Sequence, residues 1–152
     1  MTPEQLHKYD SIRPFAAEEL PEVFDRLLHN EQFLQVLAYL YPGVPVEAIG
    51  QKMHQCHTNL EFQKAFCYEF LVKLLAKASL GCDIDTTNID LHHRYTFVSN
   101  HRDIVLDSAL LDKLLFDAGC DTTTEIAIGD NLLKLPWVKD LVRINKSFIV
   151  KR

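Results

Sequence analysis

A histidine and two aspartates lie close together in the stretch SNHRDIVLD, at residues 99–107. The ordinary pKa of a histidine is about 6.5, so His101 could act as a general base near neutral pH. Asp107 could turn back to accept the second ring N–H of His101, which would fix the tautomer and support the imidazolium. Asp103 is the competing partner, although it could instead cap the helix that follows. The spacing therefore predicts a base braced by a carboxylate and leaves two carboxylates open.

Strands and helices are expected to alternate around this stretch. Three short apolar segments have the composition of strands: YTFVS at 95–99, EIAI at 125–128 and SFIV at 147–150. Helical patterns separate them, one over residues 104–118 closed by Gly119 and one over residues 132–144 interrupted by Pro136. This alternation indicates an α/β fold with βαβαβ units and a mostly parallel sheet. His101 would then follow the carboxyl end of a strand, where open α/β sheets bind their ligands.

The first eighty or so residues have a helical pattern instead. Apolar residues recur at helical spacing in residues 18–41, which predicts two helices broken near His29 and Asn30. Residues 46–56 and 60–79 predict two more helices. We therefore expect a helical segment at 1–82, a polar linker at 83–93 and an α/β portion at 94–152.

Two blocks of the α/β portion resemble a known family. YTFVSNHRDIVLDSALL is similar to the first block of the glycerol-3-phosphate and 1-acylglycerol-3-phosphate (lysophospholipid) acyltransferases. EIAIGDNLLKLPWVKDLVRINKSFIVKR resembles a second block, which ends in a basic phosphate-binding pair. Five residues separate His101 from Asp107, one more than is usual in the family. The family's later blocks do not follow residue 152, so we expect a truncated acyltransferase domain that is weakly active or inactive.

The resemblance implies a mechanism. His101 would take the proton from an acceptor hydroxyl, which attacks the thioester of acyl-CoA or of an acyl-carrier protein directly. Asp107 would orient His101, while Lys151, Arg152 and Arg102 would bind the phosphate of the acceptor. No cofactor beyond this co-substrate and no metal is implied. The acceptor could be glycerol 3-phosphate, a lysophospholipid or a lipoamino acid.

Composition limits the other classes of function that the chain could have. The formal net charge of -5 argues against nucleic-acid binding, which requires a basic face. The four cysteines form no CxxC pair, and the N-terminus has no signal-peptide pattern, so we expect free thiols in the cytoplasm. No apolar run reaches about 18 residues, so any membrane contact should be peripheral, on the inner surface. His54, Cys56 and His57 lack a fourth ligand at a sensible spacing for zinc.

A second class of function also fits the sequence. The apolar stripes of the N-terminal helices could serve a non-catalytic interaction module, with the α/β portion as its scaffold. An acyltransferase requires His101 and Arg152 to converge on one cleft, whereas an interaction module does not.

Overall fold

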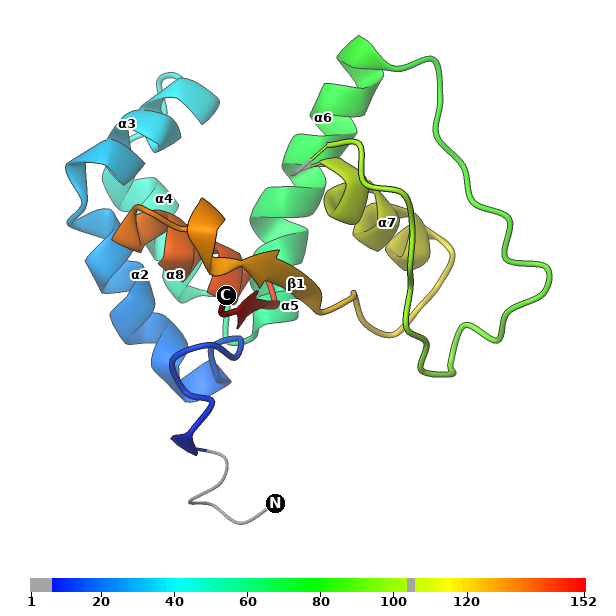
Figure 1. Cartoon of the computed structure of the whole chain (residues 1–152). Helices are drawn as coiled ribbons and strands as arrows, with labels where there is room; N and C mark the ends of the chain where they lie inside the picture. Colours follow the sequence, from blue (N-terminus) through cyan, green and yellow to red (C-terminus); the bar gives the residue numbers. More distant parts are fainter. Residues whose placement is uncertain (1–6, 104–105) are drawn as a thin grey trace. The chain divides into compact units, whose positions relative to one another are not determined.

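The structure is a computed structural model that describes residues 7–103 and 106–152. The chain divides into two compact units (Figure 1). Met1–Gln63 and Glu125–Arg152 form the first unit, and Lys64–Thr124 forms the second. The part of the expected helical segment up to Gln63 therefore shares one unit with the expected second and third strands, whereas residues 64–82 belong to the second unit.

Helices in the first unit follow the predicted pattern. Residues 18–41 form two helices that are broken at His29 and Asn30, as predicted: α2 (Leu20–Leu28) and α3 (Glu31–Leu40). The break is stable because the side chain of Asn30 accepts a hydrogen bond of 3.0 Å from the backbone N–H of Phe33. The helix predicted at 46–56 is also confirmed, as α4 (Val46–His54). A short 3-10 helix, η1 (Ala17–Glu19), precedes α2.

The core of the first unit forms around α2. Its apolar stripe is buried, and the ring of Phe24 stacks on that of Phe62 with centroids 5.7 Å apart. Phe62 belongs to a short helix, α5 (Asn59–Phe62). Residues from the other end of the chain are buried in the same unit, among them Ile144 and Ile149. Burial of these side chains is the main favourable contribution to the stability of this unit.

The sheet consists of two parallel strands. β1 (Ile126–Gly129) pairs with β2 (Ser147–Val150), and Gly129 lies opposite Val150 at their carboxyl ends. The connection contains a 3-10 helix, η3 (Asp130–Leu132), and the helix α8 (Pro136–Ile144). The predicted helix at 132–144 thus begins only at Pro136, since proline lacks an N–H and suits the first turn of a helix. The parallel strands predicted at 125–128 and 147–150 are confirmed.

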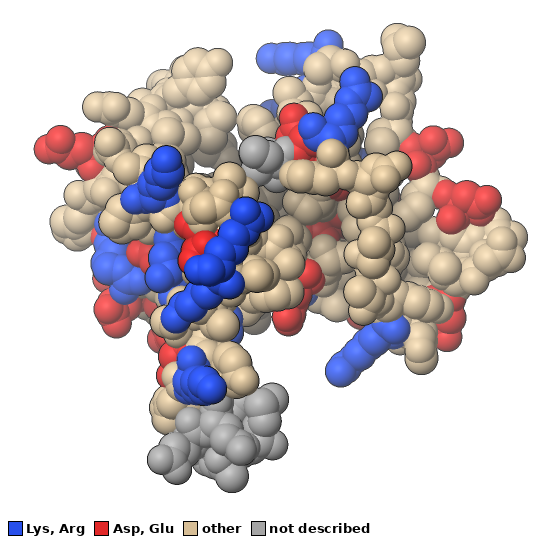
Figure 2. Space-filling view, viewed as in Figure 1, with Lys and Arg blue, Asp and Glu red and all other residues tan. Residues whose placement is uncertain are grey.

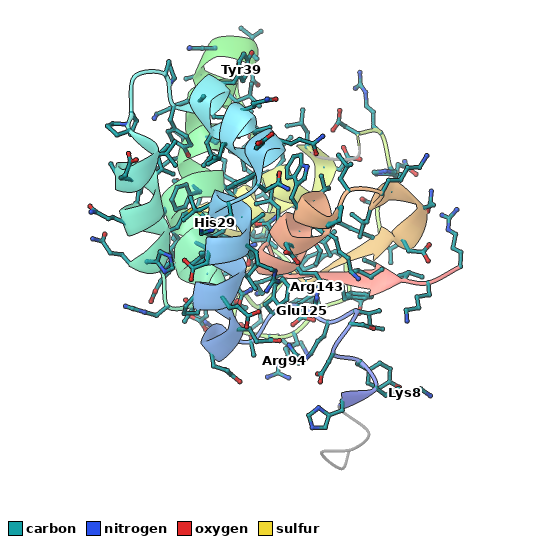
Figure 3. All side chains as sticks on the ribbon, turned by 90° about the vertical axis from the view of Figure 1, so that its left-hand side faces the viewer. Lys8, His29, Tyr39, Arg94, Glu125 and Arg143 are labelled. Atoms are coloured by element: carbon teal, nitrogen blue, oxygen red, sulfur yellow. The ribbon has the colours of Figure 1, made fainter. Side chains whose placement is uncertain are left out.

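An N-terminal segment, residues 10–15, lies along β2 and α8. The N–H of Ile149 donates to the carbonyl of Ile12 at 2.8 Å. The buried guanidinium of Arg143 donates to the carbonyl of Arg13 at 2.7 Å and lies 3.8 Å from the ring centroid of Phe15 (Figure 3). These contacts join the two ends of the chain in the first unit.

The second unit is built around two helices. The helical run predicted at 60–79 continues from α5 through a π-helical segment, η2 (Gln63–Tyr68), into α6 (Glu69–Ala78). The helix predicted at 104–118 is seen as α7 (Leu106–Asp117); residues 104 and 105 lie outside the described part. Tyr68 packs edge-on against Phe116 at 5.4 Å, and its hydroxyl donates to Asp117 at 2.6 Å. Gly119, with φ 97°, ends α7 as predicted.

The prediction of a strand at 95–99 is wrong for this structure. Residues 95–99 have no regular secondary structure, and Tyr95, Phe97 and Val98 are exposed, Val98 to 92%. The described residues therefore contain one βαβ unit, not the expected βαβαβ arrangement. Aromatic and β-branched residues favour an extended chain, but a strand forms only where a neighbouring strand pairs with its backbone groups.

Candidate functional site

His101 and Asp107 form a pair in the second unit. The Nδ1 atom of His101 lies 3.0 Å from the Oδ2 atom of Asp107. The His101 side chain is 65% exposed and the Asp107 side chain is 30% exposed. The imidazole is therefore accessible from solvent while the carboxylate is partly enclosed.

The same oxygen of Asp107 accepts two backbone hydrogen bonds. The N–H of Arg102 donates to Oδ2 at 2.7 Å, and the N–H of Asp103 donates to it at 2.9 Å. These backbone hydrogen bonds, that of Asp103 first, lower the pKa of Asp107, and the hydrogen bond from His101 lowers it further. These hydrogen bonds thus hold Asp107 ionised with its Oδ2 atom directed at His101.

Asp103 has a different contact. Its Oδ1 atom accepts the N–H of Leu106, the first residue of α7, at 2.8 Å. Of the two carboxylates that the sequence left open, Asp107 contacts the imidazole, and Asp103 caps the helix.

The pair can perform base chemistry. When Nδ1–H donates to Asp107, the Nε2 atom carries the lone pair and can accept a proton. Within residues 7–103 and 106–152, His101 has no other hydrogen-bond partner than Asp107. A base that is supported by a carboxylate, and that has no serine or cysteine of the described residues hydrogen-bonded to it, suits a reaction in which the substrate supplies the nucleophile.

The three basic residues implied by the family resemblance lie in different units. Arg102 is in the second unit, where its backbone holds Asp107. Lys151 and Arg152 are exposed in the first unit, directly after β2, and Figure 2 shows Lys and Arg side chains gathered where the chain ends. The structure brings His101 together with Asp107. The convergence of His101 with Arg152 on one cleft stays a prediction.

Residues around Arg152 add to the candidate site. Its backbone N–H lies 3.4 Å from the Oδ2 atom of Asp130, which follows β1. Asn131 and the Arg152 side chain both lie close to Gly129. Gly129, Asp130 and Asn131 were not among the site residues predicted from the sequence. They directly follow a predicted strand, so the rule that placed His101 at a strand end would have found them.

The histidine and cysteine cluster at residues 54–57 has partners within the protein. His54 Nε2 lies 3.1 Å from Asp25, and the Cys56 thiol donates to the Lys52 carbonyl at 3.5 Å. The four cysteines are free thiols, and burial raises the pKa of Cys67 to about 12. Among the residues that the structure describes, no group of three or more His, Cys, Asp or Glu could hold a metal ion.

An apolar surface lies on α3 and the start of α8. Tyr39, Leu135 and Trp137 line a shallow hollow together with Val36. Tyr39 is 85% exposed near the end of α3 (Figure 3). The Nε1–H of Trp137 donates to Gln32 at 2.9 Å. No helix in the described part of the chain is both long enough and apolar enough to cross a membrane.

Comparison with known proteins gives no relative. No family model, curated protein or solved structure matches the chain. The family resemblance of residues 94–152 therefore depends on their motifs alone.

Proposed function

We propose that this chain takes part in acyl transfer from acyl-CoA or an acyl-carrier protein to the hydroxyl of a glycerolipid or lysophospholipid acceptor in phospholipid synthesis. The observation that carries the proposal is the contact of His101 with Asp107, whose carboxylate is held by two backbone N–H groups. An exposed imidazole with a fixed carboxylate is what a general base for a hydroxyl requires.

The reaction proceeds without an acyl-enzyme. Nε2 of His101 takes the proton of the acceptor hydroxyl while the hydroxyl oxygen attacks the thioester carbonyl carbon. The carbon–sulfur bond then breaks, and the thiol leaves with the proton from His101. Asp107 stabilises the imidazolium that exists between these steps.

Lys151, Arg152 and Arg102 bind the phosphate of the acceptor in this proposal. Arginine can form two parallel hydrogen bonds to phosphate oxygens, and lysine adds a compact positive charge.

The proposed location is the cytoplasm, with peripheral contact to the inner membrane surface. Tyr39, Leu135 and Trp137 support such contact, because aromatic residues with a polar end are favoured at the membrane interface. Lys134, exposed beside Leu135, would face anionic headgroups.

The alternative is a non-catalytic helical interaction module. α2 buries its apolar stripe in its own unit, so that helix offers no docking face. Exposed apolar side chains on α3 and α6, among them Tyr39, Leu40, Phe70 and Val72, support the alternative. It predicts that His101 can be replaced without effect on function.

Replacement of His101 tests the proposal. The chain is incubated with an acyl-CoA and a panel of hydroxyl acceptors, and the release of free thiol is measured. We expect His101→Ala to lower turnover by about 100-fold or more, since a general base contributes roughly 10²–10⁴ in rate. The matched control is His93→Ala, an exposed histidine in the same unit. Equal turnover by His101→Ala and the unaltered chain would contradict the catalytic role.

Binding of the acceptor gives a second measurement, for the case in which turnover is slow. The ring signals of His101 and His93 are followed by NMR while each acceptor is added. The proposal requires a shift of the His101 signals alone, and shifts of neither ring with any acceptor would count against it.

A further inference from the structure

We propose that Asp103 is a positioning residue, whose contacts with the start of α7 hold Asp107 in place for His101. The inference rests on the proposed function, because it names a further residue that the base requires. Asp103 acts through Asp107, which is the hydrogen-bond partner of His101. All three residues belong to the second unit.

Asp103 and Asp107 contact each other in both directions. The N–H of Asp103 donates to the Oδ2 atom of Asp107 at 2.9 Å. In return, the N–H of Asp107 donates to the carbonyl of Asp103 at 3.5 Å. The place of the Asp107 carboxylate therefore depends on where the backbone of Asp103 lies.

The side chain of Asp103 fixes that backbone. Its Oδ1 atom accepts the N–H of Leu106, the first residue of α7, at 2.8 Å. In a capping box, a side chain before a helix and one in its first turn bond to each other's backbone N–H groups. Here the same exchange involves two neighbouring residues of α7, Leu106 and Asp107. Loss of the Asp103 carboxylate therefore also loosens the N–H that holds Asp107.

The Oδ2 atom of Asp107 is the point where capping and base chemistry meet. It accepts hydrogen bonds from the N–H groups of Arg102 and Asp103 and lies 3.0 Å from the Nδ1 atom of His101. The N–H of Asp103 is the largest cause that lowers the pKa of Asp107, ahead of the N–H of Arg102 and of His101. A variant that displaces this N–H should therefore raise the pKa of Asp107 toward its ordinary value.

Asn30 offers a matched control, because it caps α3 in the other unit by the same kind of contact. Its side chain accepts the N–H of Phe33, three residues further on, at 3.0 Å. Asp103 likewise accepts the N–H of the residue three positions further on. Removal of either cap should cost a similar amount of stability. Only the removal of Asp103 should disturb the candidate site.

Steady-state kinetics of the whole chain test the inference. Release of thiol from an acyl-CoA is measured with glycerol 3-phosphate as the acceptor. We expect Asp103→Ala to lower kcat about tenfold, less than the roughly 100-fold that a misplacement of about 1 Å can cost. KM should stay unchanged, because Asp103 acts on Asp107 and not on the acceptor. Asp103→Asn should recover most of the loss, since its amide oxygen still accepts the N–H of Leu106.

Titration of the Asp107 carboxyl carbon by NMR tests the same inference without turnover. The pKa of Asp107 should rise in Asp103→Ala and stay as in the unaltered chain in Asn30→Ala. The circular dichroism spectrum shows at which temperature each variant is folded, and both measurements are made below it.

The outcomes separate this inference from the proposed function. An unchanged pKa of Asp107 in Asp103→Ala would overturn the positioning role, and so would equal losses of kcat in Asp103→Ala and Asn30→Ala. If His101→Ala turns over like the unaltered chain, the acyl-transfer proposal fails. A raised pKa of Asp107 in Asp103→Ala alone would even then show that Asp103 holds Asp107.

Discussion

Asp107 accepts three hydrogen bonds at one oxygen atom, and two of the donors are backbone N–H groups. The backbone donors of Arg102 and Asp103 do not depend on the His101 side chain, so they keep acting when that side chain is removed. The carboxylate of Asp107 is therefore held ready for His101 and does not depend on it.

At the scale of single residues, we predict that the pKa of Asp107 stays below its ordinary value in His101→Ala. The hydrogen bonds from the N–H groups of Asp103 and Arg102 are the largest causes that lower it. Titration of the side-chain carboxyl carbon by NMR measures this pKa. A return to the ordinary value of about 3.9 would show that the imidazole, not the turn, controls the carboxylate.

The lowered pKa also fixes the sign of a pH effect. The folded chain favours the ionised form of Asp107, so its contribution to stability is present above the ordinary pKa of an aspartate. The contribution is lost as the pH falls through the lowered pKa of the folded state. The hydrogen bonds that Asp107 accepts should therefore weaken only in strongly acidic solution.

At the scale of elements, the cap that Asp103 provides stabilises the start of α7. The carboxylate of Asp103 accepts the N–H of Leu106, one of the unpaired donors of the first turn. We predict that Asp103→Ala lowers the free energy of unfolding by about 1 kcal/mol, measured by urea denaturation. Asp103→Asn keeps an accepting oxygen and should lose much less. Equal losses in the two variants would show that the cap contributes nothing.

The helices show what local patterns predict. The periodicity of apolar residues predicted them, because helical hydrogen bonds are local in sequence. In the structure Asn30 and Thr58 cap α3 and α5. The strand predicted at 95–99 did not form, since strand hydrogen bonds come from another segment and no segment of the described chain pairs with residues 95–99.

At the scale of the whole molecule, the exposed apolar surface of the first unit predicts binding to lipid. We expect the chain to associate with vesicles of phosphatidylcholine and phosphatidylglycerol. Tyr39→Ser should weaken this association about fivefold or more, because a large aromatic side chain would remain in water. Vesicle flotation measures the effect.

The control for this experiment is Tyr9→Ser, another exposed tyrosine, on the N-terminal segment. Equal flotation of the two variants would remove the membrane role of the surface around Tyr39. Self-association of the unaltered chain that Tyr39→Ser abolishes, without flotation, would support the interaction module instead.

The sequence by itself determined the helices, the positions of the two strands and the candidate base with its two nearby carboxylates, because each depends on residues a few positions apart. The tertiary structure decided the composition of the two units and the meeting of Gly129 and Asn131 with Arg152. Within the described part of the chain, it also left residues 95–99 without a partner strand. Such outcomes depend on contacts between distant segments, and no local pattern specifies which segments will pack together.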